Sequence, residues 1–322
     1  MTTTMAPDEW LAFIGREYLD GFIGDGGAAV KFPVPFDEAT RHTVLEGMAG
    51  RAADQHYLVL RADAAETRIH MVDQLFGRLA EQVPWRDLSR HFLEFLAARE
   101  QYTPPPPGPE SFADRLASVN DLGADFVGPE LRRALQTSVF RDTSLATDFR
   151  VAMTQLCRAE LFGGSDGEMT HQAITDWLTG RNKAVSAVKP YQIRSRISRT
   201  NARYLLESMF VWVRRAGYRG TVVLLDIDRV TVARNPKDER IYYTRAALLD
   251  VYEVLRQFID GTDRLQGCLI VVVPGREFVE TDKAMRGMGS YEALMFRVID
   301  EIRDRNLVNP MASLVRLEGA AS

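Results

Sequence analysis

Short apolar runs alternate with longer amphipathic stretches along this chain of 322 residues. The runs are rich in Val, Ile and Leu and predict five strands, at 28–34, 57–60, 221–226, 268–273 and 312–317. In the stretches around them apolar residues recur every three or four positions, and the clearest predicted helices are 8–21, 36–52, 201–215, 244–260 and 290–304. Because strands and helices alternate, we expect a parallel sheet with helices on both faces.

The middle of the chain is predicted to be helical. Residues 65–100 and 110–215 carry helical patterns, and the four prolines at 104–107 between them should form a stiff extended spacer. We therefore expect three segments. They are a first part of an α/β core at 1–103, a mainly helical insertion at 110–200, and a second part of the core at 201–322.

The composition is that of an ordinary globular protein, with 46% hydrophobic and 26% charged residues. A net charge of −4 gives no general attraction to nucleic acid or to anionic membranes, so such a contact requires a local patch. No apolar run approaches 18 residues and the start does not resemble a secretory leader, so we expect a cytoplasmic protein without membrane contact. Cys268 lies in an apolar run and is expected to be a buried free thiol. The five histidines lack metal-ligand spacing, so we expect no metal site.

The most informative segment is 221–229, Thr-Val-Val-Leu-Leu-Asp-Ile-Asp-Arg. A buried parallel strand of this kind delivers Asp226 to the rim of a pocket, where a carboxylate can hold Mg²⁺ beside a nucleotide. The sequence contains no Gly-x-x-x-x-Gly-Lys-Ser/Thr segment to hold the phosphates. The alternative is that Asp226 has a structural role, in which it caps a neighbouring helix or pairs with Arg229.

The order of several segments resembles one protein family. These segments are Arg16-Glu17-Tyr18-Leu19-Asp20, Asp25-Gly26-Gly27, Trp177-Leu178-Thr179-Gly180, the unit 201–226, and Val273-Pro274-Gly275-Arg276-Glu277-Phe278. Together they resemble the BREX-system ATP-binding family (BrxD-like proteins), a branch of the AAA-type P-loop ATPases in bacterial phage-defence loci. The resemblance implies a P-loop NTPase-like (AAA/ASCE-type) fold, a three-layer parallel sheet of about five strands with a large helical insertion. It also implies partners from the same locus, such as an intact family ATPase, and an oligomer with sites between subunits.

The sequence departs from the family pattern at both halves of the nucleotide site. Where the family has its phosphate loop, residues 35–42 read Pro-Phe-Asp-Glu-Ala-Thr-Arg-His, without glycine and with two acids. Arg41 falls at the place of the lysine and can still hold a phosphate, whereas His42 replaces the hydroxyl and is a poor Mg²⁺ ligand. Ile227 replaces the glutamate that would polarise water, and Asp228 is one residue too far along a strand whose side chains alternate.

We therefore expect no ATP hydrolysis in the manner of the family and no required cofactor. If ATP and Mg²⁺ do bind, the resemblance places these residues at the nucleotide: Thr40, Arg41, His42, Asp226 and Arg276. Arg276 follows the fourth strand, where such proteins often sense the γ-phosphate, and its alternative is a solvated loop arginine. Arg297 is a candidate arginine finger for a neighbouring subunit, and its alternative is the polar face of its helix.

A cluster of cations without an acid lies at 181–200: Arg181, Lys183, Lys189, Arg194, Arg196 and Arg199. Such a cluster can follow a nucleic-acid backbone, DNA included. The alternatives are a solvated helical surface and a dock for an acidic protein.

Three functions follow from these features. The preferred one is a catalytically degenerate ATPase-like subunit that acts as a scaffold or regulator in a BREX-like defence complex. The second is a divergent ATPase that uses Arg41, Asp226 and Asp228 in an altered geometry. The third is a nucleic-acid-binding module built on residues 181–200.

Overall fold

The computed structural model describes residues 4–280, 286–299 and 308–319, and the chain divides into two compact units. The sheet unit comprises residues 1–79 and 218–322, and the helical unit comprises residues 80–217. The helical unit therefore begins earlier and ends later than the insertion expected at 110–200. The reason is that α4 (Trp85–Arg99) and α10 (Ala202–Arg215) pack with the central helix of that unit, α7 (Thr147–Phe162).

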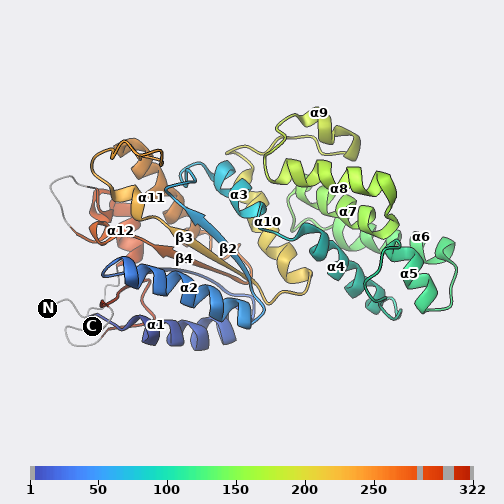
Figure 1. Ribbon diagram of the computed structural model, residues 1–322, viewed down its shortest axis with the longest axis horizontal. Coiled ribbons are helices and arrows are strands. Elements are labelled where there is room, and N and C mark those ends of the chain that lie inside the picture. The colour runs from blue at the N-terminus through green and yellow to red at the C-terminus, as the bar shows by residue number, and fades with distance from the viewer. Residues whose placement is uncertain (1–3, 281–285, 300–307, 320–322) are drawn as a thin grey trace. The chain divides into compact units, whose positions relative to one another are not determined.

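The sheet unit is built on a five-stranded, all-parallel sheet in the order β2-β3-β4-β1-β5 (Figure 1). The strands are β1 (Ala28–Val34), β2 (Leu58–Asp63), β3 (Thr221–Asp226), β4 (Cys268–Val273) and β5 (Leu314–Arg316). This result confirms the predicted parallel sheet and the approximate place of each strand. β4 is buried at every position, which explains why β4 is a continuous apolar run.

Pro33 lies within β1, which has the predicted bounds. β1 pairs with β4 through Ala28–Lys31 and with β5 through Phe32–Val34. Proline cannot donate a hydrogen bond to a neighbouring strand. Pro33 is tolerated because the strand has left its register with β4 at that position and pairs with β5 alone.

Helices cover both faces of this sheet (Figure 1). On one face lie α1 (Pro7–Ile14), its π-helical continuation (Gly15–Phe22) and α2 (Glu38–Asp54). Trp10, Ile14 and Met48 pack there with Val222 and Val271 of the sheet in one buried cluster. Replacing one of these large side chains by alanine should cost about 2–5 kcal/mol, because a cavity would remain.

The opposite face is covered by α11 (Arg245–Asp260) and α12 (Glu292–Val298) (Figure 1). Tyr252 of α11 meets Phe278 edge to face, and Phe278 stacks on Phe32 of β1 with ring centroids 5.9 Å apart. α12 occupies part of the helix expected at 290–304, and residues 300–304 lie outside the described ranges. α3 (Val72–Ala80) follows β2.

The helical unit packs around α7. The other helices are α4, α5 (Phe112–Val119), α6 (Ala124–Leu135) with a π turn at Gln136–Phe140, α8 (Gly164–Leu178), α9 (Val185–Val188) and α10. Residues 103–108, which include the four prolines, are neither helix nor strand, as predicted. Cys157 and Cys268 are buried free thiols, which confirms the expectation for Cys268.

Candidate functional site

The carboxyl ends of β1, β3 and β4 meet at one edge of the sheet unit, because all strands are parallel. Ligands of open α/β sheets bind outside this edge. The edge receives residues 35–42 from the β1–α2 junction, Asp226 at the end of β3, and Gly275 and Arg276 after β4. The tertiary structure thus brings together most of the residues that the sequence assigned to a nucleotide.

The N-terminus of α2 is closed by a carboxylate of the chain itself. Asp37 is the N-cap residue, and its side chain accepts hydrogen bonds from the Thr40 backbone nitrogen at 2.8 Å and from Thr40 Oγ1 at 2.7 Å. The backbone hydrogen bond from Thr40, with the hydroxyl bond beside it, lowers the pKa of Asp37. A phosphate would bind at this helix end through the same N–H groups and the positive end of the helix dipole. Asp37 therefore takes the place of an anionic ligand.

Arg41 is committed to an internal ion pair. Its guanidinium lies 2.8 Å from Asp228 Oδ1 and 3.1 Å from Glu38 Oε2, and only 13% of its side chain is exposed. Gly275 leaves room for this pair, because a methyl group at Gly275 would collide with Asp228 Oδ1. The side-chain alternation used to orient Asp228 does not extend to it, because β3 ends at Asp226 and Asp228 begins a 3₁₀ turn.

Asp226 carries the clearest electrostatic perturbation at this edge. Burial raises the pKa of Asp226 to about 6, although the charge of Arg41 opposes the increase. Its carboxylate accepts a hydrogen bond from the Asp228 backbone nitrogen at 3.1 Å. Asp226 therefore caps the turn that follows its own strand. The expected alternative pairing with Arg229 is wrong, because Arg229 binds the carboxylate of Asp238.

The C-terminal segment lies against the same edge. The Arg276 guanidinium stands 4.8 Å from the centre of the Phe36 ring, and its terminal nitrogen is 3.7 Å from a Glu280 oxygen. A Cβ atom at Gly319 would lie 2.9 Å from the Phe36 ring. Phe36, which is half exposed, is therefore held between Arg276 and the end of the described chain.

These residues do not fit a triphosphate with Mg²⁺ in the manner that the resemblance implies. Within residues 35–42 no backbone φ is positive, and Pro35 has no N–H to offer. Asp37 already occupies the helix end, and Arg41 already has acidic partners. His42 is exposed on α2, and its charge acts on Glu46 one turn further along the same helix.

Sequence reasoning missed three parts of this arrangement. The Asp37 cap was readable, because Asp before a helix with Thr three positions later is a capping pattern. The Arg41–Asp228 pair and the Phe36–Arg276 contact join residues far apart in the sequence and left no local signal.

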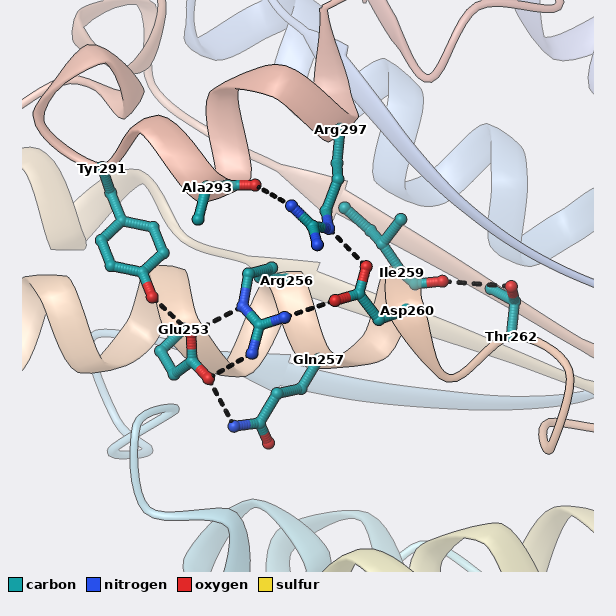
Figure 2. A network of polar contacts seen from close by, with 9 residues as sticks. All are labelled: Glu253, Arg256, Gln257, Ile259, Asp260, Thr262, Tyr291, Ala293 and Arg297. Atoms are coloured by element: carbon teal, nitrogen blue, oxygen red, sulfur yellow. Dashed lines mark hydrogen bonds and ion pairs between the residues drawn. The ribbon is translucent and has the colours of Figure 1, made fainter.

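Arg297 belongs to a polar network that fastens α12 to α11 (Figure 2). Arg297 donates to the Asp260 carboxylate and, at 2.8 Å, to the carbonyl oxygen of Ala293. Asp260 also binds Arg256, whose other partner Glu253 accepts from the Tyr291 hydroxyl. The guanidinium of Arg297 is thus bound to groups of its own chain, on the polar side of α12.

The cations of residues 181–200 lie in the helical unit. Most of this segment is not regular helix. The segment holds the single turn of α9, a 3₁₀ turn at Lys189–Tyr191 and an irregular stretch from 192 to 198. All six cationic side chains are exposed, and none forms an ion pair with any other described residue. The expected helical surface is therefore wrong in form, whereas the expected exposure is confirmed.

No helix in the described ranges has the length and apolar character needed to cross a membrane. In the same residues no group of three His, Cys, Asp or Glu side chains is placed to hold a metal ion.

Comparison with known proteins gives one match. The model of a family described as BREX system ATP-binding protein BrxC/D matches residues 122–321, which is more than half of the chain. This finding confirms the resemblance noted in the sequence. The matched range contains β3, β4, β5 and the cationic segment, whereas β1 and residues 35–42 lie before it. No curated protein and no solved structure matches the chain.

Proposed function

Because the chain belongs to the family of BREX system ATP-binding proteins BrxC/D, we propose that it is a catalytically degenerate member, which serves as a scaffold or regulator in a phage-defence complex. Membership in the family gives the defence context and places its partners within a defence locus. The loss of catalysis is our inference from the edge of the sheet.

The arrangement of the strands supports a P-loop NTPase-like fold of the AAA/ASCE type. β4 lies between β1 and β3, so the β1–α2 junction and Asp226 stand on either side of the end of β4. A nucleotide-hydrolysing site needs this juxtaposition, with the phosphates at the first helix and the metal-binding acid nearby. On our proposal the chain has kept this strand arrangement and has lost the side chains and the loop that would bind the phosphates and the metal ion.

One observation carries the proposal: side chains of the chain itself bind the N-terminal end of α2 and the guanidinium of Arg41. The Asp37 carboxylate caps α2, and the guanidinium of Arg41 forms an ion pair with Asp228. An incoming triphosphate would have to displace one carboxylate and break the other pair, while meeting their negative charge. Weakened nucleotide binding follows from these contacts.

The test is calorimetry of ATP and ADP binding by the wild-type chain, with and without Mg²⁺. The variant Arg41→Ala removes the cation that stands at the place of the phosphate-loop lysine. Its matched control is Arg61→Ala in the same unit, since Arg61 forms an exposed ion pair with Glu46. We expect no binding heat at millimolar nucleotide from any of the three proteins.

Binding by the wild type and Arg61→Ala, but not by Arg41→Ala, would refute the proposal and support the divergent ATPase. In that case Asp226→Ala should abolish turnover that depends on Mg²⁺, because Asp226 is the acid placed for the metal. The structure offers the divergent ATPase one point of support, namely that Arg41, Asp226 and Asp228 lie together.

The scaffold role is tested separately with an intact ATPase of the same locus. Of the two arginines that a neighbouring subunit could use, Arg276 is the better candidate, since 55% of its side chain is exposed and Arg297 is bound within its own chain. We expect co-expressed proteins to elute as one complex. Arg276→Ala should reduce the ATPase rate of the partner without breaking the complex.

A further inference from the structure

The helical unit carries a segment of unusual charge. No acid occurs between Asp176 and Glu207. Within this interval residues 181–200, here called the basic loop, hold six exposed cations: Arg181, Lys183, Lys189, Arg194, Arg196 and Arg199. None of the six is neutralised by an acid in the described part of the chain. In a protein of net charge −4 such a concentration of unpaired cations indicates an anionic ligand.

The main chain of the basic loop is fixed in place. Asp148 at the start of α7 accepts hydrogen bonds from the backbone nitrogen of Ser195, at 2.9 Å, and from the Ser195 hydroxyl. The indole nitrogen of Trp177 donates to the Ser195 carbonyl at 3.0 Å, and Asn201 Nδ2 donates to the Arg196 carbonyl at 3.0 Å. The cations therefore project from an ordered scaffold, which lowers the entropy lost when a ligand binds.

A hollow of about 510 Å³ adjoins this scaffold. Its lining comes from three parts of the helical unit: residues 143–148 before and at the start of α7, Ser195 and Asn201, and residues 204–208 of α10. Ser195 lines the hollow, and the exposed cations Arg194 and Arg196 flank Ser195 in the sequence. The volume lies in the range of small-molecule sites.

The lining of the hollow combines one aromatic ring, that of Tyr204, with two acids, Asp148 and Glu207. Tyr204 lines the hollow, and 54% of this residue is exposed, so its ring is accessible to a ligand. Both acids have partners: Glu207 is paired with Arg203 at 3.2 Å, and Asp148 accepts a hydrogen bond from the Ser195 backbone nitrogen at 2.9 Å. An acidic protein would use the cations and leave this ring without a partner. A nucleobase would use the ring, because every base can stack on an aromatic side chain.

We propose that the helical unit binds single-stranded nucleic acid. The phosphates follow the basic loop, and one base enters the hollow and stacks on Tyr204. The bases of a duplex are stacked on one another and do not reach such a ring, so the hollow selects a single strand. This proposal is independent of the sheet unit and of whether that unit binds a nucleotide.

The test is fluorescence anisotropy of the full chain with a labelled 20-nucleotide oligothymidine, over a range of salt concentrations. Six phosphate contacts would give a slope of log affinity against log salt of about −4, because each contact on a single strand contributes roughly −0.7. Replacing Arg194, Arg196 and Arg199 together by glutamine should change this slope by about +2. Arg133→Gln on α6, an exposed cation of the same unit, is the matched control and should lose no more than one contact.

The ring is tested by two substitutions at one position. Tyr204→Ala should weaken binding about tenfold, since stacking of one base is lost, and Tyr204→Phe should restore the wild-type affinity. Both variants keep the backbone bond from Ser208 Oγ to the residue 204 carbonyl, and circular dichroism checks that they fold.

The proposal is overturned if the glutamine variant binds as tightly as the wild type. It is equally overturned if a duplex of the same sequence binds as well as the single strand, or if Tyr204→Ala has no effect. Competition by poly-glutamate at equal charge concentration would overturn it in favour of an acidic protein partner.

Discussion

Asp226 gives the sharpest prediction, because its carboxylate is partly buried and the loss of water around it outweighs the attraction of Arg41. The substitution is Asp226→Asn, which keeps the shape and the oxygen that accepts from the Asp228 backbone nitrogen. The substitution removes the titration and the negative charge, and it replaces the second oxygen by an amide nitrogen. We expect the variant to be more stable than the wild type at neutral pH.

The magnitude follows from the pKa of Asp226, which burial raises from 3.8 to about 6. Between these two pH values the folded state binds more protons than the unfolded state, so the wild type loses stability as pH rises through this window. The loss is complete above pH 7 and amounts to roughly 3 kcal/mol, since each pKa unit is worth 1.36 kcal/mol. The asparagine variant does not lose this stability, because its side chain does not ionise.

Hydrogen exchange of the β3 and β4 amides is the suitable assay, because it reports on the sheet unit alone. At pH 7 these amides should be protected about two orders of magnitude more strongly in Asp226→Asn than in the wild type. At pH 4 the difference should shrink to about threefold. Asp25→Asn, which removes one exposed carboxylate of the same unit, is the control for the loss of a negative charge.

Two results would refute the reasoning. If Asp226→Asn were less protected at pH 7, the attraction of Arg41 would outweigh the burial of the carboxylate. If the ratio of protection were the same at both pH values, the effect of the substitution would be packing and not titration.

Three further predictions rest on individual contacts. Arg41→Met should lower the unfolding free energy of the sheet unit by about 2 kcal/mol in urea denaturation, because the Asp228 carboxylate loses its main partner, and Arg41→Lys should recover part of it. Asp148→Ala should speed hydrogen exchange at Ser195, while Asp148→Asn, which keeps an acceptor, should do so less; no change in either would show that the loop is held by other contacts. The hydrogen bond from Arg256 lowers the pKa of Glu253 to about 2, so the packing of α12 on α11 should weaken as pH falls from 4.5 to 2. In the Glu253→Gln variant, hydrogen exchange of the α12 amides should be faster at pH 7 and nearly independent of pH. The effect should be about 1 kcal/mol, because the Glu253–Arg256 pair is partly exposed.

The strands were predictable, because burial on both faces of the sheet imposes a continuous apolar run on a parallel strand. Most helices were predictable from the regular spacing of their apolar residues. β3 and β4 are strands of this kind, and α10 and α11 show a regular helical pattern. The limits of the helical unit were not predictable. They depend on which helices pack on α7, and these include α4 and α10, which lie outside the predicted insertion at 110–200.

The sequence by itself determined that residues 35–42 cannot form a glycine-rich phosphate loop, and that a cationic segment without acids follows Asp176. Both are properties of residue types in a row. Only the tertiary structure decided that Arg41 pairs with Asp228 and that Tyr204 and Ser195 line the same hollow. These contacts join positions distant in the chain, and their partners are chosen by how strands and helices pack, which no local pattern records.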